Sequence, residues 1–113
     1  MTALVTRRKV IAGVAATSAA LAMPGSVLAA PTAHEVRIKR FAFVPDRIQV
    51  RVGDTVRWIN EDLAPHTATA ESFDWDTGEI VRNQSAEVIV TAEMDTQYFC
   101  VFHPHMKGAI ELV

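Results

Sequence analysis

Apolar and charged residues alternate in short segments over most of the chain after residue 30. A period of two places successive side chains on opposite faces, which is typical of a β-strand with one buried face. In the clearest case, Ile48, Val50 and Val52 share one face, and Gly53 then marks a turn. On this pattern we expect strands over residues 35–39, 47–52, 55–59, 66–70, 87–91, 97–102 and 109–113.

The segment 97–102 differs from the others because it is apolar on both faces, which favours a central strand that is covered on both sides. Residues 71–79 contain Asp74, Asp76 and Gly78, and we expect a loop there. The sequence shows no long amphipathic helix, internal repeat or linker. About seven short strands with few helix signals predict an all-β fold, either an antiparallel β-sandwich or a small barrel.

The first 29 residues have a different pattern, that of a cleavable export signal. Basic residues at 7–9 precede an Ala-rich apolar run over residues 10–21, and small residues at 27 and 29 suit cleavage. The paired arginines resemble a twin-arginine signal, which directs folded proteins to the bacterial periplasm. A retained membrane anchor is the alternative, but spanning a bilayer takes about 20 strongly apolar residues. We therefore predict a signal peptide over 1–29, a single domain over 30–113 and a periplasmic location.

Charge narrows the choice of function. Residues 30–113 carry eight basic and all 13 acidic residues of the chain, so the predicted mature domain has a net charge of −5. Nucleic-acid phosphates attract basic surfaces, so this balance argues against nucleic-acid binding. An acidic domain is suited instead to encounters with a basic partner.

Cys100 is the only cysteine, so no disulfide can form within the chain. A lone cysteine in an exported protein indicates pairing between chains or a dedicated chemical use. Here the segment that follows it contains His103, His105 and Met106. Sulfur ligands combined with imidazole suit copper, and blue-copper centres use two His, one Cys and a weak axial Met. The segment thus supplies most of a copper site.

The missing imidazole has one good source, His66, which follows Pro65 at the start of a short predicted strand. In a β-sandwich such a strand end can lie beside the loop that joins the last two strands. His103 and His105 compete for the other imidazole position. Using His105 would require it to converge on one metal with its immediate neighbour Met106, so ligand geometry favours His103. His105 then faces solvent near the site, and His34 belongs to the N-terminal tail of the mature chain.

These motifs resemble the plastocyanin/amicyanin family of cupredoxins, which are type 1 blue copper proteins. The resemblance is carried by residues 41–45, 48–62 and 65–67 and by the Cys100-x₂-His103-x₂-Met106 spacing, which is most similar to amicyanin. It implies a Greek-key β-sandwich of about seven strands that binds one copper ion, Cu(I) or Cu(II). It further implies three strong copper ligands and a weak axial one, namely His66, Cys100 and His103 with Met106.

The resemblance also implies roles for residues near the ligands. Asn60 matches an Asn that ties the two ligand segments together by hydrogen bonds in relatives. Thr67 stands where relatives commonly have Asn, which changes the hydrogen bonds that brace the Cys loop. Residues 93–96 lack the Gly that usually forms the turn before the Cys-bearing strand.

The predicted function is a soluble, monomeric one-electron carrier between redox partner proteins. The resemblance suggests a dehydrogenase as donor and a cytochrome as acceptor. Copper handling or storage without electron transfer is the alternative. We expect no enzyme activity, because copper enzymes of this kind need further His ligands, and no stable membrane insertion. A zinc site is disfavoured because Met is a poor fourth ligand, and a binuclear copper centre would need a second Cys.

Overall fold

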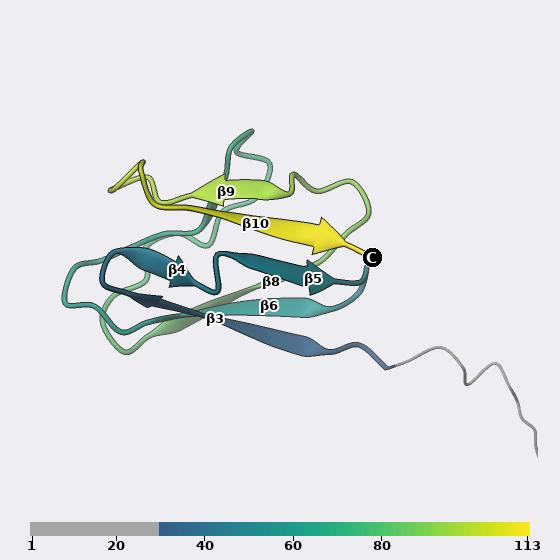
Figure 1. Cartoon of the computed structure of the whole chain (residues 1–113), viewed down its shortest axis with the longest axis horizontal. Coiled ribbons are helices and arrows are strands. Elements are labelled where there is room, and N and C mark those ends of the chain that lie inside the picture. The colour runs from purple at the N-terminus through teal and green to yellow at the C-terminus, as the bar shows by residue number, and fades with distance from the viewer. Residues whose placement is uncertain (1–29) are drawn as a thin grey trace, which may run out of the picture. The chain divides into compact units, whose positions relative to one another are not determined.

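Two four-stranded β-sheets face each other in the part of the chain that the computed structural model describes, residues 30–113 (Figure 1). The strands are β3 (Ala33–Lys39), β4 (Ala42–Val44), β5 (Arg47–Val50), β6 (Thr55–Asn60), β7 (Thr69–Ala70), β8 (Ser85–Ile89), β9 (Gln97–Phe99) and β10 (Lys107–Leu112). One sheet has the order β4-β3-β6-β8 and the other β5-β10-β9-β7. The predicted all-β sandwich is confirmed, and β9 is a central strand as its apolar pattern predicted.

We expected purely antiparallel pairing if the fold was a sandwich, but the strand pairing is mixed. β3 pairs in parallel with β6, and β5 pairs in parallel with β10, whereas the other pairs are antiparallel. The chain leaves the first sheet after β4 and joins the second at β5, so strands that are distant in sequence become neighbours. This crossing brings the C-terminal strand β10 beside a strand from the first half of the domain.

Several strand predictions need correction. The strand expected over residues 66–70 is only β7, Thr69–Ala70, and the one expected over 87–91 is β8, Ser85–Ile89. Residues 42–44 form an additional strand, β4, which the short alternation of the sequence did not reveal. β9 ends at Phe99 rather than at residue 102, because the backbone N–H of Cys100 donates to Met106 O at 3.1 Å and closes a loop. Val52 is 59% exposed rather than buried with Val50, because the chain turns after β5 and Asp54 N donates to Arg51 O at 3.0 Å.

Large side chains from both sheets fill the space between them. Trp58 on β6 and Tyr98 on β9 are fully buried, with ring centroids 5.4 Å apart in an edge-to-face contact. Trp75 from the 71–79 loop stacks on Trp58 at 5.6 Å. Aromatic rings bury large apolar areas and have defined packing geometries, so this cluster fixes how the sheets meet. A Cβ atom at Gly108 would lie 2.3 Å from Tyr98 Cζ, so β10 can approach the ring only with glycine there.

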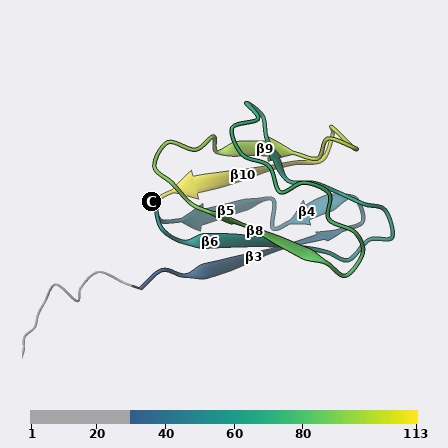
Figure 2. The ribbon, with the colours of Figure 1, turned by 180° about the vertical axis from the view of Figure 1, so that it is seen from behind.

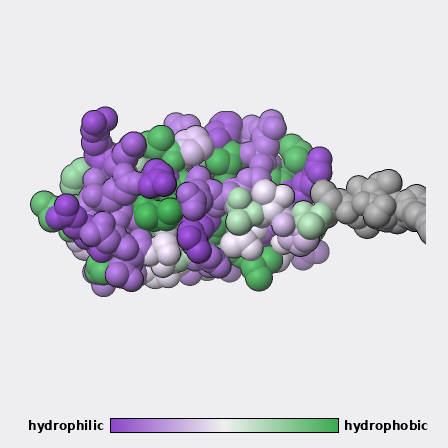
Figure 3. Space-filling view, turned by 90° about the horizontal axis from the view of Figure 1, so that it is seen from below, coloured by the Kyte–Doolittle hydropathy of each residue, from purple (hydrophilic) through white to green (hydrophobic). Residues whose placement is uncertain are grey.

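The surface over the sheets is mainly polar. Arg57 on β6 pairs with Glu87 on β8 at 3.1 Å, and Arg47 on β5 pairs with Glu111 on β10 at 2.9 Å. Seen from below the view of Figure 1, the surface is largely hydrophilic with separated hydrophobic residues (Figure 3). The alternation in the sequence therefore corresponds to one buried and one solvated face for each sheet.

Three connections meet at one end of the sandwich. The β3–β4 turn, the β6–β7 loop and the β9–β10 loop lie together at the left of Figure 1 and at the right of the reverse view in Figure 2. Residues 1–29, the predicted signal peptide, lie outside the described residues, so that assignment and its boundary stay predictions. Within residues 30–113 we find no helix long and apolar enough to cross a membrane.

Candidate metal centre

Side chains from two distant segments converge at this end of the sandwich. The Sγ atom of Cys100 lies 3.7 Å from His66 Nδ1 and 3.7 Å from His103 Nδ1. Donor atoms of these three residues all lie within 4.8 Å of one another. His66 and Cys100 are fully buried, and His103 is half-buried. The structure thus brings together three of the four predicted ligands before any metal is considered.

The spacing of these donors suits one bound metal ion. Metal–imidazole bonds of about 2.0 Å and metal–thiolate bonds of about 2.3 Å allow an N and an S atom on the same ion to lie about 3.5–3.7 Å apart. The two Sγ–Nδ1 distances of 3.7 Å agree with this separation. Two imidazoles and one thiolate are the strong ligands of blue-copper sites, so the donors present fit copper.

The β9–β10 loop is held in a tight conformation by its own backbone. His103 N donates to Cys100 O at 3.1 Å, and Met106 N donates to His103 O at 2.8 Å. With the Cys100–Met106 bond described above, these contacts close the loop on itself. Met106 is 2% exposed and belongs to the same buried core as Cys100. Its role as the weak axial ligand stays a prediction.

His66 is fixed from both sides. Its backbone N–H donates to Ile80 O at 3.1 Å, and its carbonyl accepts from Ile80 N at 2.7 Å. On the ring, Nε2 lies 2.8 Å from Asp62 Oδ2, which leaves Nδ1 free to face Cys100. A carboxylate on the second nitrogen of a metal-binding histidine orients the ring and selects its tautomer.

Asp62 also supports the β3–β4 turn. Its carboxylate accepts the backbone N–H groups of Arg40 at 2.8 Å and Phe41 at 3.0 Å. Burial of Asp62 works to raise its pKa, but these hydrogen bonds and the one to His66 outweigh burial and lower the pKa. Arg40 and Phe41 both have left-handed backbone angles, with φ of 55° and 59°. The turn that results places the Phe41 ring edge-on to both imidazoles, at 5.2 Å from His66 and 4.8 Å from His103.

Sequence reasoning did not single out Asp62 or Phe41. A carboxylate four residues before a predicted histidine ligand was a usable signal for Asp62, because metal-bound imidazoles commonly pair with carboxylates. No comparable signal identified Phe41, whose position depends on a turn that normally favours Gly or Asn at both central residues.

Thr67 makes the bridge between the two ligand segments. Its backbone N–H donates to Cys100 Sγ at 3.3 Å, and its hydroxyl oxygen accepts the N–H of Val101 at 3.0 Å. The loop is therefore braced at this position although Thr replaces the Asn common in relatives. N–H donors directed at a thiolate stabilise its negative charge and tune the metal it binds.

The role implied for Asn60 is wrong. Both hydrogens of its side-chain amide are used by backbone carbonyls, those of Ala64 at 2.9 Å and Ile80 at 2.8 Å, and its Oδ1 accepts from Asp62 N at 2.8 Å. Asn60 therefore shapes the β6–β7 loop around His66, and its amide has no hydrogen left for the Cys loop. Thr67 takes the bridging role instead, because it lies directly across from Cys100.

The remaining histidines lie apart from the cluster. His105 is exposed, and its ring centroid lies 6.4 Å from that of His103. His34 lies on β3 rather than in a solvated tail, and its Nε2 lies 2.9 Å from Asp54 Oδ2. That expectation for His34 is therefore wrong, because β3 begins at Ala33 and includes it in the sheet.

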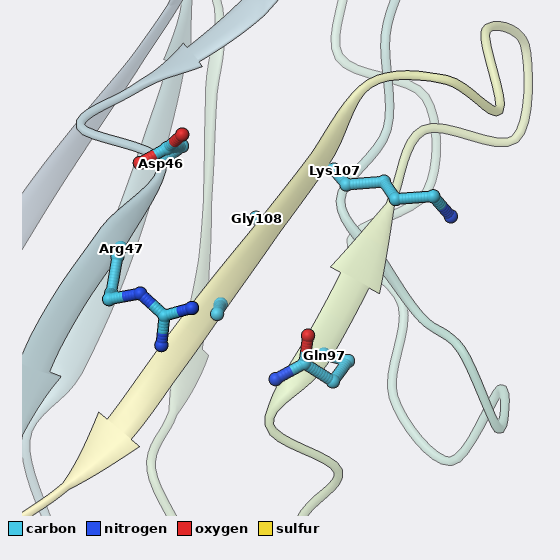
Figure 4. Close-up of a pocket in the computed structure, with 6 residues that line it drawn as sticks. Asp46, Arg47, Gln97, Lys107 and Gly108 are labelled. Atoms are coloured by element: carbon cyan, nitrogen blue, oxygen red, sulfur yellow. The ribbon is translucent and has the colours of Figure 1, made fainter.

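A surface hollow elsewhere offers no comparable donor set. It is lined by Asp46, Arg47, Gln97, Lys107, Gly108 and Ala109 on β5, β9 and β10. Figure 4 shows that the Lys107 side chain extends away from Arg47, on the other side of β10. Arg47 and Lys107 are moreover engaged by Glu111 at 2.9 Å and Glu71 at 3.4 Å. Among residues 30–113, the group of donors that could hold a metal ion is the cluster of His66, Cys100 and His103.

The sequence is similar to those of curated amicyanins. It is 28% identical to amicyanin of Paracoccus versutus over 80 residues, which span 66% of this chain and 61% of that protein. It is 31% identical to amicyanin-alpha of Methylorubrum extorquens over 81 residues, or 67% of this chain and 68% of that protein. The match thus spans less than two thirds of the Paracoccus versutus relative.

Solved amicyanin structures have the same fold. The crystal structure of Paracoccus versutus amicyanin superposes with a TM-score of 0.63 at 24% identity, covering 72% of this chain and 81% of that one. A Cu(I) form of an amicyanin variant gives a TM-score of 0.64 at 29% identity, covering 77% of this chain and 88% of that one.

Residues 30–113 match the family described as copper binding proteins of the plastocyanin/azurin type. The expected copper cofactor and cupredoxin fold are confirmed by this match together with the donor cluster. The chain belongs to the plastocyanin/azurin family of copper-binding proteins and is similar to its amicyanins.

Proposed function

We propose that this protein is a one-electron carrier whose copper is held strongly by His66, Cys100 and His103 and weakly by Met106. The observation that carries the proposal is the pair of 3.7 Å distances from Cys100 Sγ to the two imidazole Nδ1 atoms. Copper supplies one-electron chemistry when bound, since sulfur and imidazole ligands together suit both Cu(I) and Cu(II). The protein's part is to hold these donors in one geometry.

The rigidity of the site favours electron transfer over storage. Two of the three strong ligands are constrained by hydrogen bonds to other residues: His66 by Asp62 and Ile80, and Cys100 by Thr67 and Met106. Ligands that cannot move between oxidation states keep the reorganisation barrier low. A protein that takes up and releases copper for handling needs the opposite property, a site that opens easily.

His103 provides the route to a partner. It is half-buried, unlike His66 and Cys100, so its ring reaches the surface of the site. Each of the three connections at this end carries an exposed apolar side chain: Phe41 is 45% exposed, Leu63 is 80% exposed and Phe102 is 49% exposed. These side chains can contribute to the small contact areas that weak electron-transfer encounters use.

The proposal also covers where the protein acts, which partners it meets and how it assembles. The export pattern of residues 1–29 supports a periplasmic carrier. The similarity to amicyanins supports redox proteins as partners, with a dehydrogenase as donor and a cytochrome as acceptor. We propose that the protein has no enzyme activity, because the donors of residues 30–113 supply one metal cluster, without a second set of ligands beside it. We also propose that it acts as a monomer.

The electron self-exchange rate separates a carrier from a copper-handling protein. We would measure it by NMR line broadening in mixtures of the reduced and oxidised copper-loaded protein. Fast exchange supports the carrier, whereas exchange too slow to broaden the signals contradicts it. His103→Gly tests the route: we expect slower transfer and a changed visible spectrum. His105→Gly, at an exposed histidine outside the cluster, is the matched control and should leave both unchanged.

A further inference from the structure

A chain of hydroxyl groups leads from the cysteine loop to a surface carboxylate. The N–H of Val101 donates to Thr67 Oγ1 at 3.0 Å, and Thr67 Oγ1 lies 2.9 Å from Thr69 Oγ1. Thr69 Oγ1 in turn donates to Asp76 Oδ1 at 2.8 Å. Thr67 and Thr69 are 3% and 0% exposed, so water does not compete for the contact between their two hydroxyl groups. This hydrogen-bond chain passes along β7 and ends in the 71–79 loop.

The end carboxylate determines the direction of every bond in this chain. An ionised carboxylate can only accept, so the single hydroxyl hydrogen of Thr69 must be donated to Asp76. Thr69 Oγ1 can then only accept from Thr67, which uses the one hydrogen of Thr67. Thr67 Oγ1 is left as a pure acceptor, and it is paired with the N–H of the residue that follows Cys100. No other assignment satisfies all three contacts.

From this geometry we propose that Thr69 and Asp76 are positioning residues for the Cys100 loop and act on it through Thr67. With Asp76 and Thr69 in place, the Thr67 hydroxyl is oriented to accept from Val101 while its backbone N–H faces Cys100 Sγ at 3.3 Å. The two contacts of Thr67 flank the Cys100–Val101 peptide. The 71–79 loop therefore helps to set how firmly the thiolate is held and how strongly it is hydrogen-bonded.

The surroundings of Asp76 are consistent with this role. Asp76 Oδ1 also accepts the N–H of Gly78 at 2.9 Å, and its backbone forms a β-bridge with Thr69. These contacts fix the carboxylate opposite the Thr69 hydroxyl. Buried hydrogen bonds in a connected network reinforce one another, so loss of one member weakens the next. The effect of Asp76 reaches Val101 by this means without touching the ligands.

Thr69→Val tests the chain because valine keeps the shape of threonine and removes only the hydroxyl. We expect the Val101 amide to exchange with solvent about fivefold faster or more, as for the loss of one hydrogen bond. This exchange can be followed by NMR on the full chain, both metal-free and loaded with Cu(I). In the copper-loaded protein, the ratio of Cu(I) to Cu(II) at a fixed external potential should fall by about fivefold, because the thiolate loses hydrogen-bond stabilisation.

Two control variants distinguish positioning from general stability. Thr69→Ser keeps the hydroxyl and should restore both readouts to the original values. Thr77→Val removes another hydroxyl group from the 71–79 loop. This hydroxyl accepts the N–H of Ala68 at 3.0 Å but is not part of the hydrogen-bond chain from Val101 to Asp76. The Thr77→Val change should leave Val101 exchange and the Cu(I)/Cu(II) ratio unchanged. If Thr77→Val alters Val101 exchange and the Cu(I)/Cu(II) ratio as much as Thr69→Val does, the hydrogen-bond chain has no special role and the proposal is wrong.

Asp76→Ala provides a second route if Thr69→Val does not fold. The exposed carboxylate is lost, the Thr69 hydroxyl loses its acceptor, and Val101 exchange should again accelerate. If the Val101 amide of a folded Thr69→Val or Asp76→Ala protein exchanges at the same rate as in the original protein, the proposal is overturned. The copper readout rests on the proposed function, but the amide exchange of the metal-free chain does not. If the protein failed to bind copper, the proposed function would be refuted. The amide exchange of Val101 in the metal-free protein would still test the hydrogen-bond chain.

Discussion

His66 Nε2 and Asp62 Oδ2 lie 2.8 Å apart, and this contact joins the metal centre to the β3–β4 turn. The same carboxylate accepts the backbone N–H groups of Arg40 and Phe41, so one side chain holds a histidine ring and a strained turn together. The β3–β4 turn places the Phe41 ring against the imidazoles of His66 and His103. Asp62 therefore controls the orientation of His66 on one side and the covering of the site on the other.

Replacing Asp62 by Ala should weaken copper binding by about 10–100-fold, the usual cost of losing a partner of a metal-bound histidine. The His66 ring would lose its orienting acceptor, and the β3–β4 turn would lose two hydrogen bonds. Competition between the reduced protein and a Cu(I) chelator measures the change. Glu61→Ala is the control, because the neighbouring Glu61 is exposed and pairs with Arg37 rather than with the centre. Equal losses in both variants would contradict the role of Asp62.

Arg40→Gly should stabilise the fold by about 0.5–1 kcal/mol. Arg40 is exposed and has φ of 55°, a left-handed conformation that costs roughly 1–2 kcal/mol in residues other than glycine. Glycine removes this strain, although it gives back part of the gain through its greater freedom in the unfolded chain. Urea denaturation gives the free energy of unfolding. Arg82→Gly, at an exposed arginine that lacks a positive φ, should instead be neutral or destabilising.

Gly108→Ala should destabilise the domain by about 1–3 kcal/mol, the range for overpacking a core. The added methyl group would lie 2.3 Å from Tyr98 Cζ and 2.4 Å from its hydroxyl oxygen, and Tyr98 is fully buried between the sheets. Thermal unfolding of the variant checks this. The same change at Gly78 meets no atom within 4 Å, so its cost arises only from its φ of 75°. A Gly108→Ala protein as stable as the original would show that β10 can move away from the ring.

Asp54 should make the fold sensitive to acid. Backbone N–H groups of Thr32 and Arg51, followed by the His34 side chain, lower the pKa of Asp54 to about 2. A carboxyl group with a lowered pKa adds stability above its unfolded pKa of about 3.9. That stability is lost as the pH falls from about 4 to about 2. The difference in free energy of unfolding between the original protein and Asp54→Asn should shrink across this window, and a constant difference would contradict the account.

Much of the fold could be predicted because the two sheets follow simple alternation. The ends of strands could not, since they depend on contacts between distant residues. β9 stops at Phe99 because Cys100 turns its N–H toward Met106, and nothing in the apolar run 97–102 signals that change. The parallel pairing of β5 with β10 likewise joins strands at opposite ends of the domain, which alternation cannot reveal.

The residues of the centre were predictable to different degrees. Cys100 and His103 lie three positions apart, and their donor chemistry is distinctive, so the sequence alone indicated a metal loop. Asp62 is one of 13 acidic residues, and its place four residues before His66 is a weaker signal that became specific only with the contact between the two side chains. Thr69 and Asp76 are common residues whose alignment with Thr67 becomes visible only when β7 and the 71–79 loop are placed together.

The most direct test of the copper centre is the absorption spectrum of the purified protein after addition of Cu(II). The account predicts an intense band at about 600 nm from thiolate-to-copper charge transfer in a His₂Cys site, lost in Cys100→Ala and in His66→Ala. Copper binding without that band, or a band that survives in Cys100→Ala, would contradict the account, because Cys100 Sγ would then not be the ligand between the two imidazoles.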